Sequence, residues 1–571
     1  MDIEGFRKAG YAAVDSICDY YAKLQRNELP VASQVQPGFL SKLIPDHAPE
    51  DGEPWDLISS DYQSKIMPGI THWQSPSFYA YYPGNATFEG GLADLHAAMI
   101  SNPGFNWACS PSVTELEIIT LDWAARMLGF SEDFLSTSPS GRGGGIILGS
   151  ASEVAVTVAI GAREKALSLM AEKYPPPSAA DGVEMKAATN GAAQDGTHAA
   201  SLPQDDQSQL DPDAAVAAED STSHQAAVVG ENATLEAASA LAKWRGELTS
   251  RLVMYGTTQT HSIGAKAALI LGLDFRALEV TAEDGFALRG ATLEAALRED
   301  EAAGRVPFML VCSLGTTSSA ATDNLDEIVE VAKTRPTLFL HVDAAYAGVA
   351  LALPEVREKL YPKALQLVDS FSTNYHKWGL VQFDCSPLLI RDRTVLSNAL
   401  TLTPEFLRTR HGDAGSVLDM RNLQMPLGRR FRSLKLWFVL RSYGLKGFRE
   451  HLRKDIKLAD RFEEELRNDP KFELVAPPAF ALRVFRIRKQ AANGELSASQ
   501  LDQLNQLFWE QIQTRSAELL LTQTVLPQVG FCIRFVTGSP WTQEAHVVQA
   551  HRVLSECADV TLKQWSEKHQ S

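Results

Sequence analysis

Short apolar runs of strand length recur between residues 92 and 390, and helical stretches such as residues 112–128 separate them. The runs are residues 145–148, 252–255, 308–312, 338–342 and 386–390. Two parallel strands need a long crossover, usually a helix, to bring the chain back to the same end of the sheet. The alternation therefore predicts an α/β fold with a mainly parallel central sheet and helices on its faces.

The two ends of the chain differ from this middle part. Residues 4–25 carry apolar side chains at helical spacing, and proline-rich turns follow them. This pattern predicts an N-terminal helical arm over residues 1–87, which packs on another surface such as a second subunit. The large α/β domain is predicted over residues 88–434. Long charged helices with short strand-like pieces then predict a smaller C-terminal α+β domain over residues 435–571.

Residues 175–237 interrupt the α/β pattern with a stretch dominated by Ala, Asp, Gln, Ser, Gly and Pro. Such a composition buries too little apolar area to offset the entropy of ordering, so it predicts a disordered acidic insertion. The simplest interpretation is a loop inserted between a helix and a strand, with no regulatory role.

Charge and composition restrict the partners of the chain. The net charge of −17 argues against a nucleic-acid partner or an anionic membrane, either of which favours a basic face. No apolar run is long enough for a membrane span, and the first residues lack the apolar block of a signal peptide. The six cysteines form no CxxC pair, which favours reduced thiols. We therefore expect a cytoplasmic protein without a nucleic-acid, membrane or metal partner.

An aspartate and a lysine carry the sharpest chemical signal. Asp343 directly follows the apolar run 338–342, and Lys377 follows 34 residues later in the segment Asn374-Tyr375-His376-Lys377-Trp378. Pyridoxal phosphate chemistry uses this pair: the lysine amine forms a Schiff base with the aldehyde, and the aspartate keeps the pyridine nitrogen protonated. A lysine withdrawn from water has a lowered pKa and becomes a competent nucleophile. The pair predicts a pyridoxal phosphate cofactor.

Other motifs fit this cofactor, although each has a structural alternative. The segment Gly149-Ser150-Ala151-Ser152-Glu153 joins a strand to a helix, and small residues at such a turn let backbone amides approach a phosphate. His261 follows the run 252–255 and can stack on a cofactor ring or serve the fold alone. Thr317 can reach the ring hydroxyl or only form a turn. His341 can equally be a core histidine.

Taken together, these segments resemble the aromatic-L-amino-acid decarboxylase family of group II pyridoxal phosphate-dependent decarboxylases, including its aldehyde-synthase members. The resemblance covers nearly the whole chain apart from residues 175–237. The segments that carry it are residues 6–20, 66–73, 78–83, 114–117, 149–153, 341–348, 374–378, 384–385 and 426–435.

The resemblance implies the type I (aspartate aminotransferase-like) fold of pyridoxal phosphate-dependent transferases and a homodimer with its active sites at the subunit interface. It implies that Lys377 binds the cofactor, that Asp343 contacts the pyridine nitrogen and that His261 stacks on the ring. The other implied cofactor residues are Ala151, Ser152, Thr317, Ala345, Asn374 and His376. The implied substrate residues are Trp73, Tyr81, Pro83, Gly84, Phe105, His261 and Gly428.

The activity implied by the resemblance is decarboxylation of an aromatic L-amino acid (tryptophan, phenylalanine, tyrosine or dopa) to the arylalkylamine and CO₂. One catalytic position departs from the amine-forming pattern, because Phe406 stands where those enzymes carry a proton-donating tyrosine. Phenylalanine has no proton to give. The alternative is therefore oxidative deamination to the aromatic acetaldehyde with uptake of O₂, unless water, His261 or His411 donates the proton.

Two glycines bear on the choice of substrate. Gly84 stands where animal members of the family carry a threonine, and Gly428 is small as in members that accept indoles. Both leave room for a bicyclic ring, which favours tryptophan or phenylalanine over dopa. Tyrosine stays possible because Asn85 or Thr87 can meet a phenol.

Three other functional classes agree less well with these residues. A catalytically silent scaffold predicts the loss of Lys377 or Asp343, and both are present. Glutamate decarboxylation is disfavoured by the aromatic pocket residues. An aminotransferase needs an arginine for the substrate carboxylate, whereas a site that releases CO₂ gains nothing from a firm grip on it. Sequence alone leaves open whether such an arginine exists.

Overall fold

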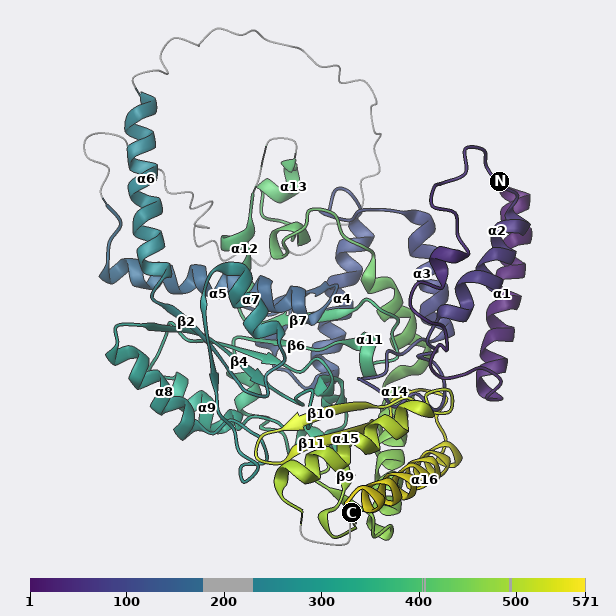
Figure 1. Ribbon diagram of the computed structural model, residues 1–571. Helices are drawn as coiled ribbons and strands as arrows, with labels where there is room; N and C mark the ends of the chain where they lie inside the picture. Colours follow the sequence, from purple (N-terminus) through teal and green to yellow (C-terminus); the bar gives the residue numbers. More distant parts are fainter. Residues whose placement is uncertain (178–229, 403, 405–406, 492–495, 570–571) are drawn as a thin grey trace.

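The computed structural model describes residues 1–177, 230–402, 404, 407–491 and 496–569 (Figure 1). Helices enclose a central sheet, with the N-terminal segment on one side and the C-terminal elements below it in the view of Figure 1. The helices before the C-terminal part are α1 (Ile3–Gln25), α2 (Trp55–Asp61), α3 (Phe88–Ile100), α4 (Pro111–Leu128), α5 (Ala151–Lys173), α6 (Gly230–Thr249), α7 (Ile263–Leu271), α8 (Gly290–Ala302), α9 (Leu325–Ala332), α10 (Pro354–Arg357), α11 (Tyr375–Trp378), α12 (Thr394–Leu400) and α13 (Arg410–Asp413).

The central sheet has the strand order β1-β7-β6-β5-β4-β2-β3. Its strands are β1 (Gly144–Leu148), β2 (Leu252–Thr257), β3 (Asp274–Leu278), β4 (Val306–Ser313), β5 (Phe339–Asp343), β6 (Ser370–Ser372) and β7 (Ser386–Ile390). The pairs from β3 through β2, β4 and β5 to β6 are parallel, and only β7 runs antiparallel to its neighbours β1 and β6. The predicted α/β fold with a mainly parallel sheet is confirmed.

The apolar alternation predicted five of these strands and missed two. β3 lies at the edge of the sheet, and its exposed Asp274 and partly exposed Arg276 interrupt the apolar pattern. β6 is only three residues long, so it carries too little pattern to be recognised. Both strands exist because neighbouring strands offer them backbone hydrogen bonds, which no short window of sequence reveals.

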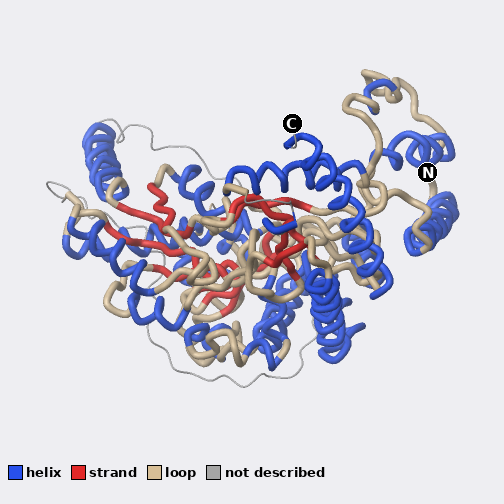
Figure 2. The backbone as a smooth tube through the Cα atoms, turned by 60° about the horizontal axis from the view of Figure 1, so that its bottom comes forward, coloured by secondary structure: helices blue, strands red, loops and turns tan. Residues whose placement is uncertain are grey.

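Helices cover both faces of the sheet, as Figure 2 shows. Successive side chains of a strand point to opposite faces, so β1 contributes to two cores. Ile146 and Leu148 pack with Val154 of α5 in one cluster, whereas Ile147 packs with Leu121 of α4 in the other. Burying each such side chain contributes roughly 1.5–3 kcal/mol, so the two cores fix the sheet between its helices.

The C-terminal part is built on a second, antiparallel sheet with the order β10-β11-β9-β8. Its elements are α14 (Arg432–Asn468), β8 (Phe472–Leu474), β9 (Leu482–Ile487), α15 (Ala498–Thr514), β10 (Thr522–Leu526), β11 (Gly530–Val536) and α16 (Glu544–His569). Phe462 of α14 stacks on Phe535 of β11 with ring centroids 3.6 Å apart, inside a separate apolar cluster. The α+β character expected for this end of the chain is present, while the domain limits 87/88 and 434/435 stay predictions.

The N-terminal helix α1 matches the prediction for residues 4–25. Asp2 caps it by accepting a 2.7 Å hydrogen bond from the backbone N–H of Gly5. Leu24 is its one buried residue, whereas most of its large apolar side chains are exposed. These exposed residues include Ile3, Phe6, Tyr11, Val14 and Ile17. An apolar stripe in this state is what an arm that packs on a second subunit requires.

The predicted disordered insertion needs a correction at its C-terminal end. Helix α6 begins at Gly230, so residues 230–237 are helical, because the alanine- and glutamate-rich sequence there favours a helix. Residues 178–229, which make up most of the predicted insertion, lie outside the described residues. Across the described ranges, each helix is too short or too polar to cross a membrane.

Candidate active site

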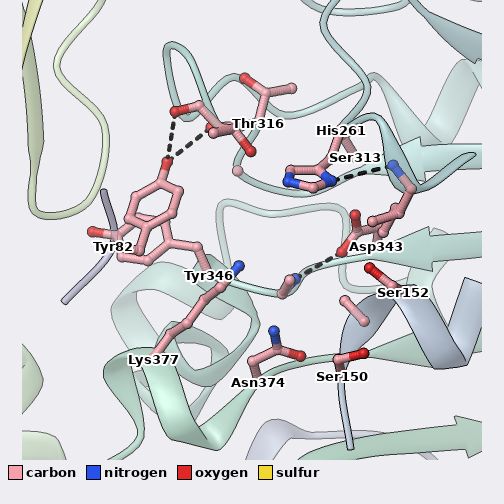
Figure 3. Close-up of a pocket in the computed structure, with 15 residues that line it drawn as sticks. Tyr82, Ser150, Ser152, His261, Ser313, Thr316, Asp343, Tyr346, Asn374 and Lys377 are labelled. Carbon is pink, nitrogen blue, oxygen red and sulfur yellow. Dashed lines mark hydrogen bonds between the residues drawn. The ribbon is translucent and has the colours of Figure 1, made fainter. Parts of the chain in front are cut away.

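A cavity lies at the carboxyl ends of the parallel strands (Figure 3). Ligands in open α/β sheets bind at this edge, where the loops after neighbouring strands converge. The structure brings together eight of the predicted cofactor residues in the lining of this cavity: Ala151, Ser152, His261, Thr317, Asp343, Ala345, Asn374 and Lys377.

Lys377 enters the cavity from the short helix α11, which follows β6. Its Nζ lies 5.6 Å from the centroid of the Tyr82 ring, and Figure 3 shows both side chains in the wall of the cavity. Burial lowers the pKa of this amine below its ordinary value, Asp343 opposes the shift, and the charge of Arg534 adds to it. The amine is therefore more readily neutral, and hence more nucleophilic, than a lysine in water.

Asp343 is the last residue of β5 and is almost completely buried at the base of the cavity. Its Oδ1 accepts a 3.0 Å hydrogen bond from the backbone N–H of Ala345, which fixes the carboxylate. His341 lies two residues earlier and belongs to the core: its Nδ1 and the Ser370 hydroxyl are 2.8 Å apart. Burial lowers the pKa of His341 to about 4, so it is a neutral core histidine, one of the two alternatives left open by the sequence.

His261 lies in the turn between β2 and α7 and presents its ring to the open cavity. The His261 side chain is open to solvent on the cavity side. The protein around the rest of the ring still removes enough water to lower its pKa. Its Nδ1 accepts a 3.2 Å hydrogen bond from the backbone N–H of Ile263, drawn as a dashed line in Figure 3. The neutral imidazole therefore carries its proton on Nε2.

The N-terminus of α5 forms another wall of the cavity. Ser150 caps this helix by accepting a 3.2 Å hydrogen bond from the N–H of Glu153, and the Glu153 carboxylate accepts one of 2.8 Å from the N–H of Gly149. The first helical residues, Ala151 and Ser152, face the cavity with free backbone donors of the first turn. A helix of this length directs positive potential at its start, which suits a phosphate group.

The turn after β4 shapes the wall opposite this helix. Gly315 has φ +85°, and a Cβ there would lie 2.5 Å from the Ala347 Cβ, so only glycine fits. The next two residues offer their carbonyl oxygens to the Tyr82 hydroxyl, which donates to Thr316 at 2.8 Å and to Thr317 at 3.3 Å. Tyr82 thereby holds the turn that presents Thr317 to the cavity (Figure 3).

The donor set of this cavity fits pyridoxal phosphate. An amine with lowered pKa can attack an aldehyde, a buried carboxylate can hold a protonated ring nitrogen, and a helix N-terminus can receive a phosphate. Lys377, Asp343 and the start of α5 provide these three groups around one cavity. No cluster of side chains suited to a metal ion occurs in the described part of the chain.

A second cavity adjoins the first and shares Tyr82, His261, Thr317 and Lys377 with it. Its walls include the predicted substrate residues Trp73, Tyr81 and Gly84, together with His376. Trp73 and Tyr81 stack with ring centroids 5.4 Å apart and planes 10° from parallel. One wall of the second cavity is therefore aromatic, and Lys377 belongs to the lining of this cavity. His376 faces this second cavity rather than the start of α5, and its Nδ1 accepts a hydrogen bond from the N–H of Cys385.

Other predicted substrate residues lie apart from both cavities. Phe105 and Gly428 belong to neighbouring segments, and Gly428 lines a different cavity beside Pro103. Pro83 is buried against Gly538. Phe406, predicted as a catalytic position, lies outside the described residues.

Sequence reasoning missed several residues that the fold brings to the site. Tyr346 stacks on Tyr82 with ring centroids 3.7 Å apart, and both line the first cavity. Arg534 lines the second cavity from β11 of the C-terminal sheet. The signal available for Arg534 was a single charge within the apolar run Phe531–Val536, which by itself does not indicate what the charge faces.

Comparisons with known proteins agree with this geometry. The family model described as "Pyridoxal-dependent decarboxylase conserved domain" matches residues 37–201 and 197–488. A phenylacetaldehyde synthase from Arabidopsis thaliana is 37% identical, with 98% of this chain and 97% of that protein covered. Tyrosine decarboxylase 2 from Narcissus pseudonarcissus is also 37% identical, with coverage of 98% and 95%. The crystal structure of Oryza sativa TDC with PLP and tryptamine is 32% identical, with a TM-score of 0.81 and coverage of 98% and 99%.

Proposed function

Because the chain belongs to the pyridoxal-dependent decarboxylase family, we propose that it removes CO₂ from an aromatic L-amino acid and releases the arylalkylamine. One observation carries the proposal: the Lys377 amine lies where the two cavities meet. The first cavity contains Asp343, and the second is walled by Trp73 and Tyr81. Burial lowers the pKa of the amine at this junction. The names of relatives, which include tyrosine and tryptophan decarboxylases, support an aromatic substrate.

The enzyme is a pyridoxal phosphate-dependent carboxy-lyase. When bound, the cofactor supplies an electron sink for the pair of electrons left at Cα as CO₂ departs. We assign Lys377 as its covalent anchor and Asp343 as the carboxylate that keeps the pyridine nitrogen protonated. We assign the remaining contacts to His261, Ala345 and Thr317 around the ring, and to Ala151, Ser152 and Asn374 around the phosphate. The predicted phosphate contact of His376 is not retained, because this side chain faces the second cavity.

Each of these side chains has a definable task in the reaction. Lys377 would hold the cofactor, because its readily neutral amine can attack an aldehyde. Asp343 would keep the pyridine nitrogen protonated. Its carboxylate is already held by the Ala345 N–H, so it needs no rearrangement during the reaction. His261 offers an Nε2–H toward the substrate side of the cavity, and the stacked Trp73 and Tyr81 rings bind the aromatic side chain.

We further propose that two copies of the chain form the active enzyme. Phe105 and Gly428 lie apart from both cavities of their own chain, and the apolar stripe of α1 is exposed. A partner copy would cover the stripe and bring its own Phe105 and Gly428 to the aromatic cavity. A mixed dimer of Lys377→Ala and Phe105→Asp subunits should then regain activity that neither homodimer has. A mixed dimer without activity would argue against shared sites.

We place this homodimer in the cytoplasm. The acidic chain and its six free cysteines support that compartment, because thiols persist where the redox poise is reducing. Fractionation of the source cells, with the protein followed by antibody, tests the assignment. Recovery in an oxidising compartment would contradict it.

The deciding experiment is product analysis with purified enzyme, pyridoxal phosphate and tryptophan, tyrosine, phenylalanine or dopa in turn. CO₂ and the matching amine in equal amounts are the expected products. The Lys377→Ala variant, treated identically, is the matched control. If none of the four amino acids releases CO₂ from the native enzyme, the aromatic substrate class is wrong.

A second function is favoured by Phe406, which has no hydroxyl to protonate Cα, and by the similarity to a phenylacetaldehyde synthase. In that reaction the amino acid, O₂ and water give the aromatic acetaldehyde, CO₂, ammonia and hydrogen peroxide in equal amounts. The same assay should therefore measure aldehyde and peroxide beside amine. Amine without peroxide supports the decarboxylase, and aldehyde with equimolar peroxide supports the synthase.

A further inference from the structure

Arg534 is a buried cation without an acidic partner among the residues that the structure describes. Its side chain is 3% exposed in strand β11, and it forms no ion pair with any carboxylate of the described residues. Arg483, opposite the neighbouring Phe535 in the same sheet and equally buried, pairs with Asp460 and Glu463 instead. An unpaired buried charge is costly, so its retention beside the substrate cavity calls for a function.

The guanidinium of Arg534 clamps one residue of the aromatic wall. Its Nη2 donates to the Tyr81 carbonyl oxygen at 3.2 Å, and its Nη1 donates to Thr522 Oγ1 at 2.9 Å. The same Thr522 Oγ1 accepts a 3.3 Å hydrogen bond from the Tyr81 N–H. Arg534 and Thr522 face each other across β10 and β11, so this pair holds both polar groups of the Tyr81 backbone.

Tyr81 needs such a clamp because its backbone is strained. It has φ +54°, in the left-handed region that residues with a Cβ rarely adopt. A strained residue persists only where its surroundings determine it fully. The clamp therefore sets the position of the ring that stacks on Trp73 in the substrate cavity.

The charge of Arg534 also acts on Lys377. The Arg534 guanidinium carbon lies 4.9 Å from the centroid of the Tyr82 ring, and Lys377 Nζ lies 5.6 Å from the same centroid. The charged or titratable groups that face Lys377 from the packed elements are Asp343 on β5, His261 before α7, Tyr82, Tyr346, the adjacent His376 and Arg534 on β11. Burial is the main cause that lowers the Lys377 pKa, and Arg534 reinforces it against the opposing Asp343.

We propose that Arg534 is a positioning residue that holds the strained Tyr81 in the substrate wall and, through its uncompensated charge, favours the neutral form of the Lys377 amine for cofactor capture. The role of Arg534 in holding Tyr81 rests on the proposed function, whereas its effect on Lys377 concerns only the chain and its cofactor. Two of the five N–H donors of Arg534 are used for Tyr81 and Thr522, whereas its Nε has no hydrogen-bond partner among the described residues.

The charge effect is tested by cofactor capture, without any substrate. Full-length enzyme stripped of cofactor is mixed with pyridoxal phosphate, and the rate of formation of the protein-bound chromophore is measured against pH. Arg534→Met should move the midpoint of this profile to higher pH by about one unit, which slows capture near neutral pH about tenfold. Arg534→Lys should keep the native midpoint because it keeps the charge.

A matched control comes from the same sheet. Arg483→Met removes an equally buried arginine whose charge is already paired, so it should lower stability but leave the capture midpoint in place. A native midpoint in Arg534→Met would overturn the charge effect. A shift of the same size in Arg483→Met would overturn it as well, because the shift would then reflect general loosening.

The clamp is tested by binding of two ligands to the holoenzyme. Arg534→Lys replaces the planar guanidinium, which donates to both the Tyr81 carbonyl and Thr522, by a single ammonium group. The variant should therefore weaken the binding of tryptamine and of α-methyltryptophan several-fold, by the same factor. A loss confined to α-methyltryptophan would overturn the clamp and make Arg534 a carboxylate ligand. If native enzyme binds neither ligand but the capture profile shifts as expected, the substrate is not an indole and the charge effect stands.

Discussion

The indole Nε1 of Trp378 donates a 2.9 Å hydrogen bond to the buried carboxylate of Asp455. Trp378 directly follows Lys377 in α11, and Asp455 belongs to α14, so the bond ties the lysine segment to the C-terminal part of the molecule. The same indole stacks on Tyr346, which in turn stacks on Tyr82 in the wall of the cofactor cavity. A row of three rings therefore leads from Asp455 to the active site.

Asp455 should make stability depend on pH. Burial raises its pKa to about 7, so the folded protein favours the protonated carboxyl. The stabilisation by this proton is complete below the pKa of the unfolded chain, near 4, and is lost as the pH rises through about 7. Asp455→Asn keeps an acceptor for Trp378 but cannot ionise. Its stability relative to native enzyme should rise by roughly 1.4 kcal/mol per pH unit across this window.

Urea unfolding of the native enzyme and of Asp455→Asn between pH 5 and pH 8 measures this difference. Asp51→Asn, which changes an exposed carboxylate, is the control and should show no such trend. A constant difference between native enzyme and Asp455→Asn across the range would mean that Asp455 is already charged in the fold.

The buried ion pair of Glu117 and Arg429 should be costly to break. Both side chains are fully buried, and two hydrogen bonds of 2.7 Å join them. Arg429→Met leaves the Glu117 charge without its partner, so the free energy of unfolding should fall by about 3–5 kcal/mol. The double variant Glu117→Gln/Arg429→Met should lose less than the sum of the single changes, as a double-mutant cycle in urea can measure. Additive losses would contradict a direct pair.

Lys377 and Asp343 should differ in how their loss affects the enzyme. Lys377→Ala should abolish covalent attachment of the cofactor, which absorbance detects. Asp343→Asn should still bind the cofactor but lower kcat by about 10²–10³-fold, because the developing negative charge loses its electrostatic support. Lys266→Ala, an exposed lysine of α7, is the control and should retain full activity. An Asp343→Asn variant with native kcat would refute the assigned role.

Phe406→Tyr should change the ratio of products. If the native enzyme forms aldehyde because Cα stays unprotonated, the new hydroxyl should shift most of the product to amine and reduce peroxide accordingly. Phe406→Leu, which changes the side chain without adding a proton donor, is the matched control. Unchanged aldehyde and peroxide in Phe406→Tyr would show that another group decides between the products.

Gly84→Ala should narrow the substrate cavity. A Cβ at this position would lie 3.5 Å from the His376 carbonyl oxygen and 3.8 Å from Trp73 Cε3, which are ordinary contact distances. The fold should therefore tolerate the methyl group, while the bicyclic ring of tryptophan loses room. We expect kcat/KM for tryptophan to fall by about threefold to tenfold relative to that for phenylalanine. An equal fall for both substrates would argue against a size effect.

Part of the site could be predicted because it depends on local pattern. Asp343 follows an apolar strand, and Ala151 and Ser152 open a helix after a glycine-rich turn, so short segments sufficed to identify them. Tyr82, Tyr346 and Arg534 escaped prediction because their importance arises from contacts between distant segments. The Arg534 bond to Tyr81, for example, joins residues 453 positions apart.

By itself, the sequence determined the mainly parallel α/β fold, the amphipathic α1 and the lysine and aspartate of the cofactor cavity, because periodicity and turn chemistry act over a few residues. Only the tertiary structure decided that β3 and β6 complete the sheet and that Phe105 and Gly428 lie away from their own cavity. It also decided that an unpaired arginine of the C-terminal sheet faces Lys377. These features depend on which distant surfaces meet, and that choice rests on the packing of the whole chain.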